Sequence, residues 1–129
     1  MRWQSTIVPA IAAALGAFAM TALPEQAAAP QGRSLFEKRC SGCHDLDGTK
    51  VGPPLRHVFA RHSASDPRFH YSEALKKARI TWDAASLDRW LLNPDAVVPD
   101  NDMPFRLENA EERAAIIAYL RASASSSGP

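Results

Sequence analysis

The chain has 129 residues, which is enough for one domain with a modest hydrophobic core. It carries 15 Lys and Arg residues against 14 Asp and Glu residues, so its formal net charge at pH 7 is only +1. This balance lacks the basic excess that nucleic-acid-binding domains have, and we therefore expect no nucleic-acid partner.

An uncharged, Ala-rich apolar run occupies the N-terminus. It follows Arg2, and the motif Ala-Ala-Ala at residues 27–29 resembles the cleavage site of a secretory signal peptide. Pro30, directly after that site, disfavours cleavage, and the run is nearly long enough to span a bilayer. Residues 1–29 are thus predicted to be a signal peptide or an uncleaved membrane anchor formed by residues 5–23. In either case we expect a periplasmic or otherwise exported domain, which contacts a membrane only if this segment is retained.

The first helix of the domain is predicted over residues 31–40. It runs directly into the sequence C-S-G-C-H at residues 40–44, which has the C-x-x-C-H spacing of covalent haem attachment. Each cysteine at this spacing can form a thioether with one haem vinyl group, and the histidine that follows can ligate the iron. The motif therefore predicts one haem c, bound through Cys40 and Cys43, with His44 as an axial ligand.

Other uses of the two cysteines fit the sequence less well. A redox dithiol belongs in a βαβ pattern, and no such pattern surrounds the motif. A zinc site needs about two more Cys or His ligands at suitable spacing, and the chain has no further cysteine. A disulfide between Cys40 and Cys43 would leave the role of His44 unexplained.

Two helices are predicted in the middle of the chain, separated by proline-rich loops. A short helix covers residues 71–78, with Ser72 near its N-cap. The next helix is capped by Asp83 and ends at Pro94, because proline disfavours the helical conformation of the residue before it. An irregular stretch is expected from residue 95 to residue 107.

The last helix is predicted to begin after Asn109, where Glu112 three residues later completes a capping-box pattern. The domain is expected to span residues 30–122, and the small, polar residues 123–129 are expected to form a disordered tail. Strand-like alternation is scarce, so the fold class is predicted to be all-α with long loops. Loops of such length are uncommon in a small domain, and a buried prosthetic group on which they pack would account for them.

The irregular stretch also contains the leading candidate for a second axial ligand, Met103. A thioether is a soft, neutral ligand that favours ferrous iron and raises the reduction potential. The alternative is a methionine that fills a gap in the core. His57, His62 and His70 could compete for the iron, but their surroundings are those of ordinary solvated loops.

From about Gly32 to Ala122 the chain resembles class I cytochrome c, as found among exported bacterial cytochromes. Besides the attachment motif, these residues match the family: Gly32, Phe36, Gly52, Pro53, Leu55, Arg61, Tyr71, Trp82, Asn93, Pro94, Pro99, Met103, Phe105, Ile116, Tyr119 and Leu120. The resemblance implies a fold in which the N-terminal and C-terminal helices cross, with short helices and long loops wrapped around one haem.

The resemblance also implies roles for residues around the haem. The carbonyl of Pro53 would accept a hydrogen bond from the imidazole of His44 and so fix its tautomer. Asn101 stands where relatives commonly have a threonine that contacts a haem propionate. Three further side chains would surround and hydrogen-bond the propionates: Arg61, Tyr71 and Trp82.

Two features depart from the family pattern. Trp90 replaces the tyrosine that is usual on the methionine side of the haem, and we expect the sulfur of Met103 to be hydrogen-bonded differently, since an indole cannot accept a hydrogen bond. Three acidic residues also occupy the methionine loop, where mitochondrial relatives carry lysines: Asp95, Asp100 and Asp102. The haem edge should therefore be mixed in sign, which affects encounter rate and partner choice.

The motif and the resemblance together predict a monomeric one-electron carrier that shuttles electrons between redox-partner proteins and is not an enzyme. With both axial positions filled, iron cannot bind a substrate. One alternative is a haem enzyme, or a peroxide-binding or gas-binding protein, in which Met103 is a labile ligand. Another is a dedicated electron-transfer subunit of an oxidoreductase complex.

Overall fold

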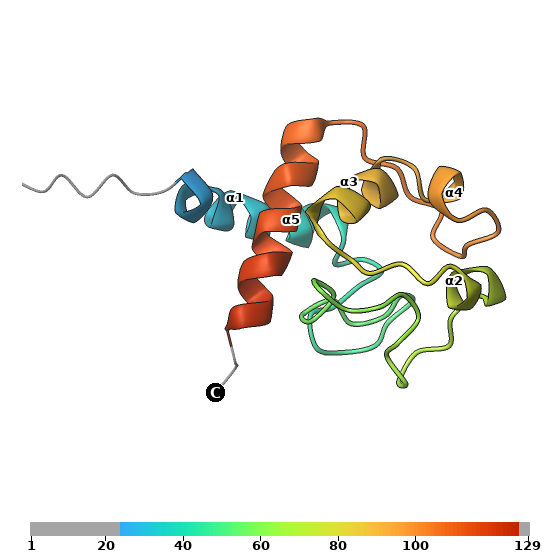
Figure 1. Ribbon diagram of the computed structural model, residues 1–129. Coiled ribbons are helices and arrows are strands. Elements are labelled where there is room, and N and C mark those ends of the chain that lie inside the picture. Colours follow the sequence, from blue (N-terminus) through green and yellow to red (C-terminus); the bar gives the residue numbers. More distant parts are fainter. Residues whose placement is uncertain (1–23, 127–129) are drawn as a thin grey trace, which may run out of the picture.

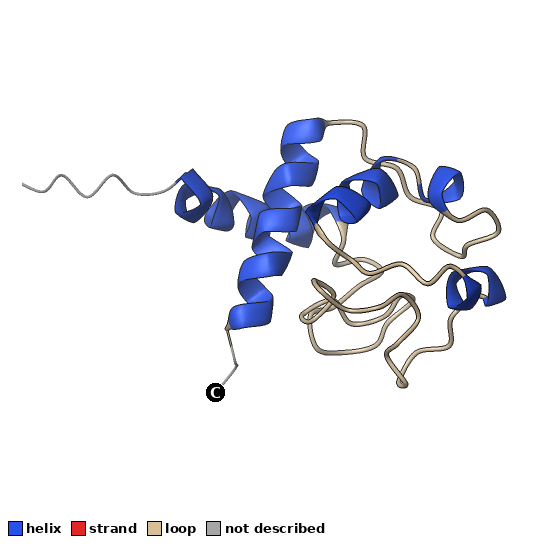
Figure 2. Cartoon of the chain, viewed as in Figure 1, coloured by secondary structure: helices blue, strands red, loops and turns tan. Residues whose placement is uncertain are grey.

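The computed structural model describes residues 24–126, and the regular secondary structure within them is helical (Figure 1). In chain order the helices are α1 (Pro24–Arg39), α2 (Glu73–Lys77), α3 (Ala84–Leu92), α4 (Pro94–Val97) and α5 (Ala110–Ser125). Long loops join them, above all between α1 and α2, and these loops gather on one side of α5 (Figure 2). The predicted all-α fold class is confirmed.

Helices α1 and α5 cross each other, as Figure 1 shows, and the crossing depends on a glycine. A Cβ atom at Gly32 would collide with the backbone carbonyl oxygen of Ala115 and would lie 2.7 Å from the Cβ of Tyr119. Beside this contact the rings of Phe36 and Tyr119 pack at a centroid distance of 5.5 Å. Glycine is unfavourable inside a helix by about 1 kcal/mol, so its value here is the close approach of two backbones. The predicted helix crossing is confirmed.

Helix α3 packs against α5 through its apolar side. Leu87, Trp90 and Leu91 are buried at helical spacing, as the sequence predicted. At its N-terminus the carboxylate of Asp83 accepts from the N–H of Ser86 at 2.7 Å, and the hydroxyl of Ser86 accepts in return from the N–H of Asp83 at 2.8 Å. This reciprocal cap fixes where α3 begins and therefore where its apolar side faces.

Two features of the helices differ from the predictions. Helix α1 begins at Pro24 rather than at residue 31, so Pro30 lies inside it. Residues 27–29 are alanines, the strongest helix formers, which accounts for the extension upstream of Pro30. The second difference is the short helix α4: α3 ends before Pro94 as predicted, but Pro94 then opens a helix where an irregular stretch was expected from residue 95. Its missing N–H costs nothing there, because the first N–H groups of a helix have no partner.

The C-terminal end of α5 corrects the predicted tail. The helix continues to Ser125, and Ser123 is buried with its hydroxyl donating to the carbonyl of Leu120 at 2.9 Å. The start of the tail was therefore placed too early, because a serine hydroxyl can bond back to its own helix instead of to solvent. Residues 127–129 lie outside the described part of the chain.

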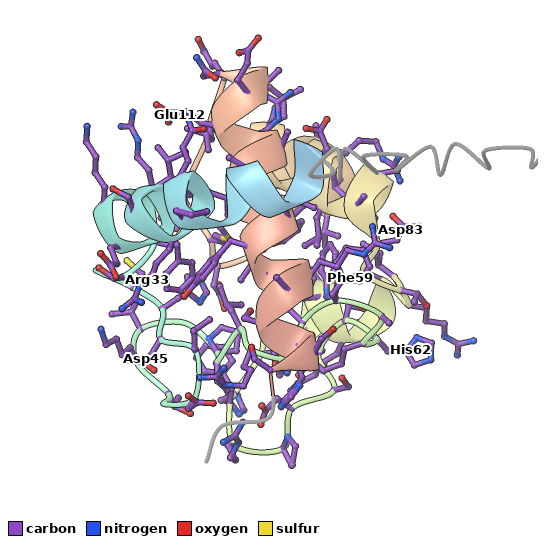
Figure 3. All side chains as sticks on the ribbon, turned by 90° about the vertical axis from the view of Figure 1, so that its left-hand side faces the viewer. Arg33, Asp45, Phe59, His62, Asp83 and Glu112 are labelled. Atoms are coloured by element: carbon purple, nitrogen blue, oxygen red, sulfur yellow. The ribbon has the colours of Figure 1, made fainter. Side chains whose placement is uncertain are left out.

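The N-cap of α5 is confirmed only in part. The side chain of Asn109 accepts from the N–H of Glu112 at 2.8 Å, as predicted. The carboxylate of Glu112 does not return to the cap, however, but accepts two bonds from the guanidinium of Arg39, each of 3.1 Å. In Figure 3, Glu112 projects at the end of α5 that lies above α1. A residue that would complete a local cap instead ties α5 to the end of α1.

Within residues 24–126, none of the helices has the length and the apolar character that crossing a bilayer requires. The anchor predicted at residues 5–23 lies outside this range, whereas the last residues of the predicted signal segment 1–29 lie inside it and begin α1.

Candidate haem site

The C-x-x-C-H motif forms a tight turn at the end of α1. The N–H groups of Cys43 and His44 both donate to the carbonyl of Cys40, at 3.0 and 2.8 Å. Cys40 is itself bonded to the carbonyl of Phe36 at 2.8 Å, so the turn keeps the register of the helix. All three motif side chains, those of Cys40, Cys43 and His44, line one cavity. The local hydrogen bonding of the motif thus presents both thiols and the imidazole to the same space.

The imidazole of His44 is oriented by its neighbours. Its Nδ1 lies 2.8 Å from the carbonyl oxygen of Pro53, and because a carbonyl only accepts, Nδ1 carries the hydrogen and Nε2 keeps its lone pair. Burial lowers the pKa of His44, although the bond to Pro53 opposes this, so the ring favours the neutral form that ligates metals. A Cβ atom at Gly52 would lie 2.6 Å from Nδ1, so only glycine leaves room for the ring.

The cavity is too large to be a packing defect. The centres of water molecules could occupy about 240 Å³ of it, whereas roughly 10–15 Å³ is enough for one water. Protein interiors are close-packed, so a space of this size in a small core indicates room for a bound group. Its walls are mainly apolar and come from the loops as well as from α3 and α5: Leu55, Val58, Leu87, Leu91, Ile116 and Leu120.

Met103 lines the same cavity as His44. Its sulfur accepts a hydrogen bond from the indole Nε1–H of Trp90, with Nε1 and Sδ 3.1 Å apart. Trp90 is buried on α3 and packs edge-on against Trp82, with ring centroids 5.2 Å apart. Although Trp90 replaces the family's tyrosine, the sulfur of Met103 still has a hydrogen-bond donor. A thioether sulfur has two lone pairs, so one hydrogen bond leaves the other lone pair available for a metal.

The propionate end of the cavity contains buried polar atoms without partners in the protein. The hydroxyl of Tyr71 and the Nε of Arg61 are both buried and make no hydrogen bond to any described residue. Buried polar groups are nearly always hydrogen-bonded, so two orphans facing one cavity need an acceptor from elsewhere. A carboxylate supplies the acceptor that each of them lacks. These residues therefore fit a haem whose propionates reach Arg61 and Tyr71.

Backbone pairing brings Trp82 to the same end of the cavity. The N–H of Ala60 donates to the carbonyl of Trp82 at 2.7 Å, and the N–H of Trp82 donates to the carbonyl of Arg61 at 2.9 Å. Trp82 is buried and lines the cavity, as Arg61 and Tyr71 do. The structure thus brings together the three side chains that the family resemblance implied for the propionates.

Asn101 also lines the cavity, but its amide is occupied elsewhere. Its Nδ2 donates to the carboxylate of Asp95 at 3.0 Å and to the carbonyl of Val98 at 2.9 Å. Its Oδ1 accepts from the N–H of Met103 at 2.8 Å. Both Nδ2 hydrogens and the Oδ1 of Asn101 are thus used inside the loop. The amide has no hydrogen left to donate to a haem propionate, the contact that the family resemblance implied.

A carboxylate that the sequence did not single out lies behind Arg61. Asp66 is buried, and its oxygens accept from the guanidinium of Arg68 at 2.7 and 3.0 Å, while Arg61 approaches to 3.5 Å. The hydrogen bond from Arg68 lowers the pKa of Asp66 to about 2, against the opposing effect of burial. Two guanidinium groups therefore share one buried carboxylate, and net positive charge is left near the propionate end.

The three other histidines do not reach the cavity. His57, His62 and His70 are all exposed, and none of them lines it. The ring of His62 points outward at the surface in Figure 3, and its Nδ1 lies 2.9 Å from the hydroxyl of Thr81. Within the described residues, Met103 is left as the soft donor from outside the C-x-x-C-H motif that shares the cavity with His44.

The state of the cysteines disfavours a redox dithiol. Burial raises the pKa of Cys40 to about 11, so its thiol stays protonated at neutral pH. A catalytic dithiol needs the opposite, a depressed pKa that produces the thiolate. The two thiols are also not joined in a disulfide. Residues 24–126 bring together no group of three or more His, Cys, Asp or Glu side chains that could hold a metal ion directly.

Comparison with known proteins identifies the family. The model of the family described as cytochrome c matches residues 29–124. The chain belongs to the cytochrome c family. It is 43% identical over 94 residues to cytochrome c2 of Rhodomicrobium vannielii, a match that covers 70% of this chain and 74% of that protein. It is 41% identical over 95 residues to cytochrome c of Chlamydomonas reinhardtii, covering 70% of this chain and 85% of the relative.

A solved structure supports the same assignment. Cytochrome cH from Methylobacterium extorquens superposes with a TM-score of 0.69 at 34% sequence identity, covering 73% of this chain and 97% of that one. The predicted mono-haem class I cytochrome c is thereby confirmed. This cytochrome carries haem c attached through Cys40 and Cys43, and it is an electron-transfer protein rather than an enzyme.

Some contributors to the site could not be found from the sequence. Asp66 and Arg68 lie two residues apart in a loop, a spacing that carries no signal of an ion pair beneath a ligand. Arg113 is buried on α5 and donates to the carbonyls of Leu107 and Glu108, at 2.9 and 2.8 Å, which secures the chain just after the methionine loop. The helical spacing of α5 indicated an apolar side but gave no reason to bury an arginine.

Proposed function

We propose that this cytochrome is an exported one-electron carrier in which His44 and Met103 are the two axial ligands of the haem iron. The observation that carries the proposal is that both side chains line one cavity, with Nε2 of His44 free to bind a metal and the sulfur of Met103 oriented by Trp90. Imidazole and thioether together are the ligand pair of electron-carrying cytochromes.

When bound, the haem supplies an iron that gains and loses one electron. The protein's own part is to keep the surroundings of that iron unchanged by the transfer. Pro53 holds the ring of His44, and Trp90 and Asn101 hold Met103 at its sulfur and its backbone. Leu87, Leu91 and other apolar side chains line the cavity and would exclude water from around the bound haem. A ligand set that is fixed in advance needs little rearrangement between oxidation states.

The groups around Met103 favour a carrier over the catalytic and gas-binding alternatives. The side chains hydrogen-bonded to it are an indole and a carboxamide, and neither titrates near neutral pH. A peroxide-using enzyme needs a positioned acid or base beside its open iron site. Within residues 24–126 no such group is hydrogen-bonded to Met103, so the proposal assigns no catalysis to this side.

The partners are proposed to be redox proteins, reached by diffusion in the periplasm or an equivalent compartment. Charges near the cavity are of both signs and largely paired: Arg39 with Glu112 at 3.1 Å and Arg106 with Asp95 at 3.4 Å. Such a surface steers encounters less strongly than a ring of lysines does. The exported location is supported by the apolar, uncharged N-terminal segment and by the need to attach haem c outside the cytoplasm.

The experiment that tests this is an optical spectrum of the purified holoprotein, oxidised and reduced, with and without carbon monoxide. We expect a low-spin spectrum with the ferric methionine charge-transfer band, and no change when carbon monoxide is added to the ferrous form. Met103→Ala should abolish that band, lower the reduction potential and open the iron to carbon monoxide. A high-spin ferric form of the unmodified protein, or an unchanged potential in the variant, would refute His44/Met103 ligation.

The location is tested separately, by fractionating cells that express the full-length chain. We expect haem-containing protein in the periplasmic fraction if the N-terminal segment is cleaved, and in the membrane fraction if it is retained. N-terminal sequencing of the mature protein distinguishes the two. Apoprotein that stays in the cytoplasm without haem would contradict the proposed export.

A further inference from the structure

Two hydrogen bonds to side chains hold Met103, one at its backbone and one at its sulfur. Its backbone N–H donates to Oδ1 of Asn101 at 2.8 Å, and its sulfur accepts from the indole of Trp90 at 3.1 Å. Methionine is the most flexible of the apolar side chains, with three rotatable bonds, and it readily leaves one position for another. Holding both the backbone and the sulfur removes much of that freedom.

The Asn101 bond is itself anchored at two points. The Nδ2 hydrogens of Asn101 go to the carboxylate of Asp95 on α4, at 3.0 Å, and to the carbonyl of Val98 just after α4, at 2.9 Å. A side-chain amide offers two hydrogens and one carbonyl oxygen, and here all of them are used within residues 95–103. The amide therefore closes the loop on itself and keeps no donor for the haem.

We propose that Asn101 is a positioning residue for the sixth iron ligand rather than a haem-binding residue. Its amide, anchored at Asp95 and Val98, fixes the backbone of Met103 and so keeps the sulfur beside Trp90. The inference rests on the proposed ligation by Met103. The proposal also connects a surface carboxylate to the iron ligand. The side chain of Asp95 is 59% exposed, and it acts on Met103 through the amide of Asn101.

The test is the rate at which imidazole displaces Met103 from ferric iron, followed by loss of the methionine charge-transfer band. Asn101→Leu keeps the size of the side chain and removes all of its hydrogen bonds. We expect displacement at least about tenfold faster than in the unmodified protein, the effect of one to two lost hydrogen bonds. An unchanged rate would overturn the proposal.

A control variant that lowers the stability of the fold by a similar amount to Asn101→Leu separates a positioning role from general destabilisation. Tyr119→Leu removes the ring contact with Phe36 between α5 and α1, and neither residue lines the cavity or bonds to Met103. We expect a lower unfolding midpoint with no change in the displacement rate. An acceleration equal to that of Asn101→Leu would show a merely structural role for Asn101 and overturn the proposal.

Two surface substitutions keep the test informative if Asn101→Leu retains too little haem. Asp95→Ala removes an exposed anchor of Asn101 that does not line the cavity. It should accelerate displacement about two- to threefold, as expected when a modest exposed contact is lost. Arg106→Gln removes only the cation that lies 3.4 Å from the other carboxylate oxygen of Asp95, and it should leave the rate unchanged. Equal rates in both variants would count against the anchoring role.

Failure of this inference can be told from failure of the proposed function. If Met103→Ala binds imidazole no faster than the unmodified protein does, Met103 is not the sixth ligand and both proposals fall. If Met103→Ala opens the iron while the substitutions at Asn101 and Asp95 leave the displacement rate unchanged, ligation stands and only the positioning role falls.

Discussion

The two sides of the cavity are built in different ways. On the histidine side, the last turn of α1 runs into the motif, and Pro53, nine residues after His44, orients its ring together with Gly52. On the methionine side, Met103 is held by groups from several elements: Trp90 on α3, Asp95 on α4 through Asn101, and Arg113 on α5 through the end of the loop. The contacts that orient His44 come from nearby in the sequence, whereas those that hold Met103 come from separate elements of the tertiary structure.

This difference has consequences for what each side tolerates. Local hydrogen bonds and covalent thioethers make the histidine side stiff, so a single atom in the wrong place should prevent a haem-binding conformation. The methionine side is stabilised by several contacts of about 1 kcal/mol each, so removing any one of them should weaken the site only in part. Four substitutions test this contrast, in order of decreasing expected effect.

Gly52→Ala should leave little stable holoprotein. The added Cβ would lie 2.6 Å from Nδ1 of His44, so either the imidazole or the backbone beside Pro53 must move. Haem content per polypeptide after export measures the effect. Gly42→Ala is the matched control, because a Cβ at Gly42 meets no atom within 4 Å, and its haem content should be normal. Equal haem contents in the two variants would show that the histidine side is less stiff than its geometry indicates.

Arg113→Met should lower the free energy of unfolding by roughly 2–3 kcal/mol, because carbonyls of the methionine loop lose a charged donor and Asp88 loses its partner. Guanidinium denaturation measures this. The control is Arg33→Met, which removes an exposed pair with Glu37 on α1 and should change the free energy by less than about 0.5 kcal/mol. Figure 3 shows Arg33 at the surface. Similar losses in both variants would contradict a special role for the buried guanidinium.

Asp66→Asn should change how stability depends on acid. The pKa of Asp66 is depressed to about 2 in the folded protein, so its ionised form contributes stability that is complete above the unfolded pKa near 4 and is lost as the pH falls through about 2. Unfolding free energies measured from pH 7 to pH 3 should therefore differ between the two proteins by a constant amount near neutrality, and by less toward pH 3. A difference that does not shrink in acid would mean that Asp66 is not held by Arg68 as described.

Trp90→Phe should lower the reduction potential by on the order of 40 mV, the one-electron equivalent of about 1 kcal/mol. The indole N–H draws electron density from the sulfur of Met103, which favours ferrous iron, and phenylalanine keeps an aromatic ring but not the donor. Trp90→Tyr restores a hydroxyl donor and should recover part of the potential. Spectroelectrochemical titration measures all three proteins, and a potential unchanged in the phenylalanine variant would mean that the bond does not tune the iron.

The sequence predicted the histidine side closely and the methionine side less fully. The spacing of Cys40, Cys43 and His44 implies their geometry, and the family resemblance implied the bond between His44 and Pro53. For Met103 the sequence indicated the residue but not its support. Asn101 was placed at a propionate by analogy with relatives, whereas its amide is used up within the loop, because Asp95 and Val98 come close only once α4 has formed.

The fold shows the same division. Helix caps at Ser72, Asp83 and Asn109 follow from residue type and were predicted, since a cap needs only the next few residues. The role of Glu112 could not be predicted, because its carboxylate meets Arg39 from a helix at the other end of the chain. The end of α5 was misplaced for a related reason: burial of Ser123 depends on what packs around it, and sequence polarity alone does not report that.

By itself, the sequence determined the chemistry of this protein: a haem anchored at Cys40 and Cys43, one imidazole ligand, and an all-α chain to surround them. Those features depend on residue type and short spacing, which the covalent chain preserves in any conformation. The tertiary structure alone decided how Met103 is held, which buried carboxylate lies behind Arg61, and which N–H faces the sulfur. These are contacts between segments far apart in sequence, and only packing around a common cavity brings such groups within hydrogen-bond distance.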